Sequence, residues 1–122
     1  MSFVVELAVM QDEMTIRRTV VDEVRLISLA SEQLAYEKAV PHVNIVAELL
    51  SGFCDDLFHP KSPEWVSQFT ESELKGLAHL YGVMMEVDSG AASCVSELLK
   101  DEKWRRVIAV AKELYPSLEP NA

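Results

Sequence analysis

The chain has 122 residues, of which 49% are hydrophobic and 25% charged, and its formal net charge is −9. This length and composition predict a single globular domain with its own core and exclude a disordered chain. The negative charge argues against nucleic acid and anionic membrane surfaces as main partners, because both would repel it.

The charge is concentrated in the middle of the chain. Residues 39–99 contain nine acidic residues and only two basic ones, Lys61 and Lys75, so this segment carries −7. Opposite charge accelerates association between proteins. A basic protein partner is therefore the first expectation, although an acidic balance also simply keeps a small protein in solution.

The N-terminal sequence MSFVVELAVMQDE has no basic start, and Glu6 interrupts its apolar residues. This pattern is not that of a secretory signal, so we expect a cytoplasmic protein. Cys54 and Cys94 are the two cysteines. Isolated cysteines in a reducing compartment behave as small apolar residues, and we expect free thiols rather than a disulfide or a nucleophile.

The apolar spacing predicts an all-α fold, a compact bundle of five or six helices within residues 1–116, followed by a flexible tail at 117–122. No Gly or Pro lies between Val4 and Val40, which predicts one long N-terminal helix. This helix could be broken near Gln11–Asp12, where Asp12 could cap the start of a second helix. Its buried face is expected at Val20, Val24, Ile27, Ser31 and Leu34.

Helix starts and stops recur along the rest of the chain. Pro41 fits the first turn of the next helix, Ser62-Pro63 starts a short helix, and Thr70 with Glu73 forms a capping box. Asp101 is expected to cap the last helix and Pro116 to end it. The stretch 59–87 is therefore interpreted mainly as a corner between helices.

Beside this corner, the sequence suggests a surface for a partner. Gly76 and Gly82 interrupt a strong helix pattern, where glycines often allow close helix crossing or a groove. Methionine side chains next to them adapt readily to a partner. The predicted partner-binding residues are Glu71, Glu73, Met85, Glu86 and Asp88.

A metal site is the chemical alternative. His59 lies four residues after Asp55 and three after Asp56, so each pair could share a helix face. His42, His79 or Glu86 could complete the metal site from elsewhere in the chain. The paired Glu-x-x-His units of helical di-metal proteins are absent from the sequence. The simpler interpretation is two solvated acids and a loop histidine.

The sequence contains no catalytic or nucleotide-binding motif, so we assign no catalytic residue and no cofactor. It favours a non-enzymatic protein-binding module that meets a basic partner: an inhibitor, an immunity or antitoxin-like protein, or a small chaperone or adaptor. The alternatives are a metal-binding protein or enzyme at Asp55, Asp56 and His59, and a self-associating bundle, such as a homodimer, built along the N-terminal helix.

Overall fold

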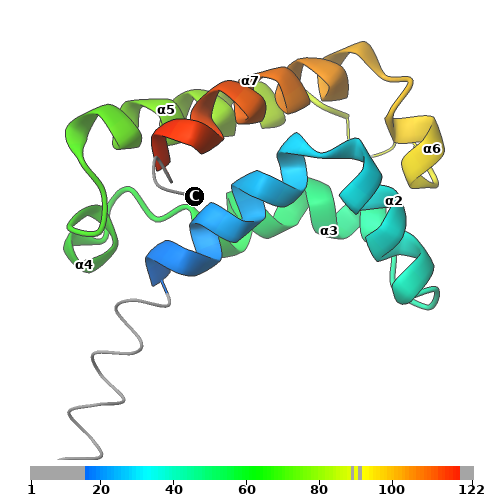
Figure 1. Ribbon diagram of the computed structural model, residues 1–122, viewed down its shortest axis with the longest axis horizontal. Coiled ribbons are helices and arrows are strands. Elements are labelled where there is room, and N and C mark those ends of the chain that lie inside the picture. Colours follow the sequence, from blue (N-terminus) through cyan, green and yellow to red (C-terminus); the bar gives the residue numbers. More distant parts are fainter. Residues whose placement is uncertain (1–15, 89, 91, 119–122) are drawn as a thin grey trace, which may run out of the picture.

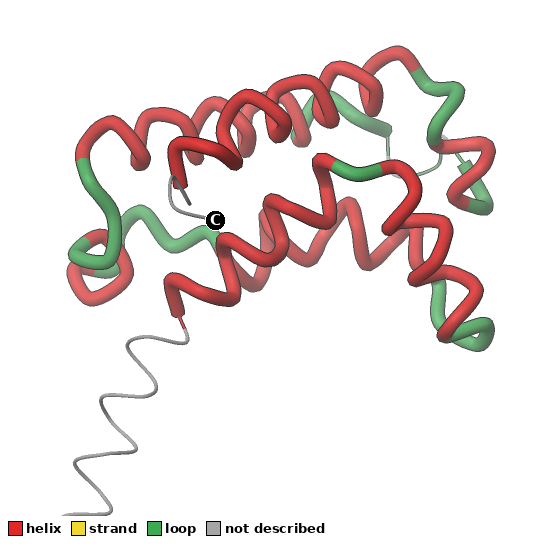
Figure 2. The backbone as a smooth tube through the Cα atoms, viewed as in Figure 1, coloured by secondary structure: helices red, strands yellow, loops and turns green. Residues whose placement is uncertain are grey.

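The computed structural model describes residues 16–88, 90 and 92–118, and within them the chain forms helices and loops without a strand (Figure 2). This confirms the predicted all-α bundle. The first described helix covers residues 16–28. It is followed by α2 (Ala30–Ala39), α3 (Ile45–Ser51), its π-helical continuation η1 (Gly52–Leu57), α4 (Pro63–Val66), α5 (Glu71–Met84), α6 (Val95–Leu98) and α7 (Glu102–Leu118).

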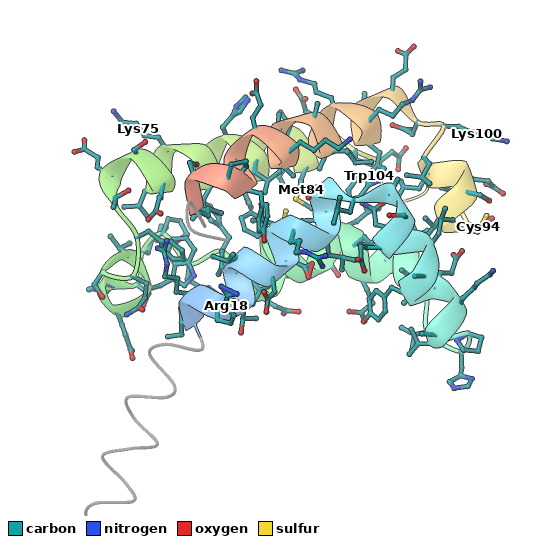
Figure 3. All side chains as sticks on the ribbon, viewed as in Figure 1. Arg18, Lys75, Met84, Cys94, Lys100 and Trp104 are labelled. Carbon is teal, nitrogen blue, oxygen red and sulfur yellow. The ribbon has the colours of Figure 1, made fainter. Side chains whose placement is uncertain are left out.

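The helices form two layers (Figure 1). Helices α5 and α7 lie side by side in one layer, residues 16–28 and α3 form the other, and α4 and α6 lie at opposite ends. Met84 and Trp104 point between the layers, whereas Lys75 and Lys100 point away from them (Figure 3). The largest fully buried apolar side chains are those of Ile27, Ile45, Leu49, Phe53, Leu77, Leu80, Leu98 and Trp104. No helix in the described residues is long and apolar enough to cross a membrane.

The predicted long N-terminal helix is interrupted at Leu29, and Gln11–Asp12, the expected break, lies outside the described residues. Leu29 is extended (φ −124°, ψ 103°). The fully buried Gln33 holds the break: its Nε2 donates to the carbonyls of Leu26 (3.1 Å) and Ile27 (2.9 Å), and its Oε1 accepts from Trp104 Nε1 (3.1 Å). The Gln33 side chain thus gives the Ile27 carbonyl a partner at the end of the helix and adds a second one to the Leu26 carbonyl, which also accepts from the N–H of Leu29.

The break also changes which face of the chain is buried. Val20, Val24 and Ile27 are buried as predicted, but Ser31 and Leu34 are exposed. In α2 the only buried residue is Gln33. The expected stripe therefore holds for residues 16–28 and is wrong for α2, because the extended residue at 29 turns the second helix to a new face.

The second predicted helix begins later than expected. Pro41 lies in a turn, and Asn44 is the N-cap of α3, its Oδ1 accepting from the N–H of Ala47 at 3.1 Å. An Asn side chain supplies the acceptor that a free helix N–H requires, which Pro41 does not. Downstream, Val46 and Phe53 are buried.

The stretch 59–87 contains the predicted corner. Ser62 Oγ accepts from Trp65 N (3.3 Å), and the Thr70–Glu73 capping box is complete, with bonds of 3.2 and 2.8 Å. Trp65 and Phe69 are buried and their ring centroids lie 4.8 Å apart. The corner is thus anchored by aromatic packing.

Helix α7 starts where predicted and ends later. Asp101 Oδ1 accepts from the N–H groups of Lys103 (2.9 Å) and Trp104 (3.1 Å). Pro116, expected to end the helix, lies inside its last turn, and the helix continues to Leu118, which is 2% exposed. Residues 117 and 118 are thus helical rather than part of a loose tail, and 119–122 lie outside the described residues.

Candidate binding site

The residues predicted to bind a partner do not form one surface. Glu71 is the first residue of α5 and is exposed, 4.0 Å from Lys75 Nζ. Met85, 61% exposed, follows the last residue of the same helix, and Glu86 and Asp88 come next. A 14-residue helix rises roughly 20 Å. Glu71 is therefore separated from the other exposed members by the length of α5.

Glu73, the fifth predicted member, is 8% exposed and is not available to a partner. Its carboxylate accepts from Arg17 in two bonds of 2.8 and 3.0 Å and also from the backbone N–H of Thr70. The hydrogen bond from Arg17 is the main cause that holds the pKa of Glu73 below its usual value, with the N–H of Thr70 adding to it. Glu73 is a structural residue, and its placement on the surface was wrong.

Basic residues of α7 lie beside the other end of the predicted surface. Glu86 Oε2 is 3.5 Å from Arg106 Nη1, and Glu86, Glu102, Lys103 and Arg106 line one shallow depression. Two acids and two bases offset one another there. This end of α5 consequently offers a basic partner less net negative charge than the sequence alone indicated.

The residues of the metal alternative lie at the end of η1 and in the loop after it. Asp55, Asp56 and His59 are exposed, and the ring Nε2 of His59 is 2.7 Å from the backbone carbonyl of Asp56. One ring nitrogen is thus already in contact with the protein backbone. Within the described residues, no group of three or more His, Cys, Asp and Glu could hold a metal ion.

A pocket of about 290 Å³ lies between residues 16–20 and the η1–α4 segment. Its apolar side consists of Ile16, Val20, Leu57 and Trp65. Trp65 is fixed there because its Nε1 donates to the carbonyl of Leu57 at 2.8 Å. The polar lining residues are Thr19, Asp56, His59, Ser62 and Glu64. Among the described residues that line the pocket, none is Lys or Arg.

Acidic residues continue along the contact between the first described helix and α3–η1. Glu23 lies one turn after Thr19, and a β-carbon added at Gly52 would be 3.4 Å from Glu23 Oε2. Glu48 and Asp56 lie four residues before and after Gly52, so they follow one side of α3–η1. We call Glu23, Glu48, Asp56 and Glu64 the acidic seam.

Within the seam, the Glu48 carboxylate acts on that of Glu23. Burial, and secondly the charge of Glu48, raise the pKa of Glu23 from 4.5 to about 7. Burial penalises the ionised form, and a neighbouring negative charge does the same. The seam is thus a place where added positive charge would stabilise the carboxylates that are present.

Cys54 does not offer an activated thiol. Cys54 and Cys94 are free and half-buried. Burial, with the Asp55 carboxylate, raises the pKa of Cys54 to about 11. The ionised nucleophile is therefore disfavoured at Cys54. Cys94 Sγ lies 3.2 Å from Ser96 Oγ.

Comparison with known proteins adds no relative to these observations. No protein-family model, curated protein or solved structure matches the chain. The candidate site is therefore argued from the geometry and charge of the chain's own residues.

Neither the pocket nor the position of Glu23 beside it was predicted from the sequence. Ile16, Thr19 and Glu23 are spaced at i, i+3 and i+7, which places them on one helix face, and this was the available signal. The spacing could not show that this face borders α3–η1. Only the packing of the two segments brings Thr19 and Asp56 into the same pocket.

Proposed function

We propose that the protein is a non-enzymatic binding module whose acidic surface engages a basic protein partner. The observation that carries this proposal is the exposure of the central negative charge. Of the nine acidic residues in 39–99, only Glu73 is buried and the other eight are exposed. Most of this negative charge therefore lies on the surface, where a basic partner could approach it.

The distribution of ion pairs supports the same function. Glu71 and Glu86 lie near Lys75 and Arg106. Within the described part of the chain, no base pairs with Glu48, Asp55, Asp56 or Glu64. Unpaired charge of one sign steers a partner of opposite charge and favours the encounter more at low than at high salt.

The test starts from the immobilised full-length protein and lysate of the source cells, followed by titration with the purified retained protein. We expect a stoichiometric complex with a basic protein whose association rate falls steeply as salt rises. A partner that is not basic, or an association rate indifferent to salt, contradicts the proposal.

Self-association is a second candidate, favoured by one observation. Leu34, Tyr36 and Val43, in α2 and the turn after it, are 38–41% exposed. A second copy packing on α2 would cover them. Light scattering over a concentration series decides: a constant mass near 13.7 kDa contradicts self-association.

A further inference from the structure

The pocket beside residues 16–20 has the size and lining of a receptor for one or two side chains. Its volume of about 290 Å³ lies at the lower limit of the roughly 300–1,000 Å³ usual for small-molecule sites. Ile16, Val20, Leu57 and Trp65 give it an apolar wall. Aromatic and aliphatic anchors filling such pockets dominate the affinity of many protein interfaces.

The charges around the pocket specify what else the occupant carries. Asp56 and Glu64 line the pocket itself, Glu23 lies one turn after Thr19 on the first helix, and Glu48 acts on Glu23 from α3. An occupant with cationic groups next to its apolar anchor would match this arrangement.

The two arginines of the first described helix form their ion pairs with acids outside the pocket. Arg17 is held by Glu73 and by the carbonyls of Gln68 and Leu118. Arg18 lies 3.6 Å from Asp22. Lys61 lines the depression next to the pocket, in the turn that includes His59.

We propose that this pocket receives the apolar side chain of an amphipathic basic helix of the partner, with Lys or Arg one turn away lying against Asp56, Glu64 and Glu23. This inference rests on the proposed function and adds the place and the chemistry of the contact. Four residues of helix rise about 6 Å, so a helix lying along residues 16–23 with its apolar side chain in the pocket would bring a Lys or Arg one turn away next to Glu23. A second copy of this chain is disfavoured as occupant because it too carries −9.

The test uses the full-length protein and a synthetic amphipathic peptide with Leu on one face and Lys on the other. Two control peptides replace either Lys by Gln or Leu by Ser. Thr19→Trp closes the pocket mouth from an exposed helix position, and Ala78→Trp is its control on exposed α5. Asp56→Asn with Glu64→Gln neutralises the rim, and Glu71→Gln with Glu86→Gln removes the same charge elsewhere.

Fluorescence polarisation of the labelled peptide gives Kd, and thermal unfolding confirms that each variant is folded. We expect Thr19→Trp and the Asp56/Glu64 variant to weaken binding about tenfold, the effect of one lost anchor or of two lost charge contacts. The Ala78 and Glu71/Glu86 variants should retain wild-type affinity. The Leu-to-Ser and Lys-to-Gln peptides should both bind more weakly than the parent.

Several results overturn the pocket. Equal losses in the two charge-matched variants would leave an acidic binding surface but remove the pocket from it. No binding of the peptide to wild-type protein contradicts the pocket, while the proposed function is judged separately by the salt dependence of its captured partner. If the mass of the wild-type protein rises with concentration and Thr19→Trp abolishes this rise, the occupant of the pocket is a second copy. If Thr19→Trp lowers Tm and the wild-type protein does not bind the peptide, the occupant is the chain's own first 15 residues.

Discussion

Arg17 and Glu73 join the first described helix to the start of α5 by two hydrogen bonds, of 3.0 and 2.8 Å. Arg17 also donates to the carbonyl of Leu118 at 2.8 Å, and its guanidinium lies 5.4 Å from the Phe69 ring centroid. The Arg17 side chain thus connects residues 16–28, in one layer, with the start of α5 and the end of α7 in the other. Removing it leaves Glu73, 8% exposed, without its main cation.

We therefore expect Arg17→Ala to lower the free energy of unfolding by about 2 kcal/mol, less than for a fully buried ion pair because the Arg17 side chain is 34% exposed. Arg17→Lys should not restore it, because an ammonium group cannot reproduce the two-bond geometry. Urea unfolding measures both. Glu71→Gln, at an exposed neighbour of the capping box, is the control and should leave the midpoint unchanged; an equal loss there would contradict a specific role for Arg17.

Gln33 is expected to hold the break at Leu29. Gln33→Leu leaves the carbonyl of Ile27 and the Trp104 Nε1 without the partners they have here, while the carbonyl of Leu26 still accepts from the N–H of Leu29 at 3.2 Å. Unsatisfied buried groups cost about 1–3 kcal/mol each, so we expect a loss of about 3 kcal/mol in chemical unfolding. Glu32→Gln, next to it on the outer side, is the control. A loss below about 1 kcal/mol would show that the break does not depend on Gln33.

Two glycines of α5 give a matched pair. A β-carbon at Gly76 would lie 2.5 Å from Leu114 Cδ1, whereas one at Gly82 meets nothing within 4 Å. Gly82→Ala should stabilise by about 0.5–1 kcal/mol, the helix propensity difference. Gly76→Ala should destabilise by about 1–2 kcal/mol, because Leu114 is packed in the core and overpacking exceeds the propensity gain. The Tm of each variant measures both effects. If both substitutions raise Tm, or both lower it, the close approach of α5 and α7 is contradicted.

The pH dependence of stability should separate Glu23 from Glu73. The raised pKa of Glu23 favours the folded state below about pH 4.5, and this contribution is lost as pH rises through about 7. Because Glu23 is partly exposed, we expect the loss to be about 2 kcal/mol rather than the full value of the shift. The lowered pKa of Glu73 acts in the opposite sense, and its stabilisation disappears as pH falls below 4.5.

Glu23→Gln should accordingly flatten the decline in stability between pH 5 and pH 8 and leave the acid limb in place. Unfolding midpoints in urea at a series of pH values measure both limbs. Glu48→Gln should flatten the decline less than Glu23→Gln, since burial is the larger cause of the shift. A wild-type protein equally stable at pH 5 and pH 8 would contradict the buried position of the Glu23 carboxylate.

Local signals in the sequence predicted most of the fold. Ser62, Thr70 and Asp101 cap helices because a cap depends on the residue itself and the next three N–H groups. Apolar spacing likewise identified the buried face of residues 16–28. These features could be predicted because their causes lie within one or two turns.

Features that depend on distant residues were not predicted. The break at Leu29 has neither Gly nor Pro and is held by Gln33 and, through it, by Trp104. Glu73 was placed on the surface because its capping role was visible and Arg17, 56 residues away, was not. The pocket next to Trp65 requires two segments about 40 residues apart to meet, which no local spacing reveals.

The central claim is that a basic partner meets the acidic seam rather than the end of α5. The most direct measurement is a map of backbone amide chemical shifts in the full-length protein as the Leu/Lys peptide is added. We predict that shifts concentrate in residues 16–23 and 48–65. Shifts concentrated around Met85, Glu86 and Arg106, or spread evenly over all exposed carboxylates, would contradict the claim.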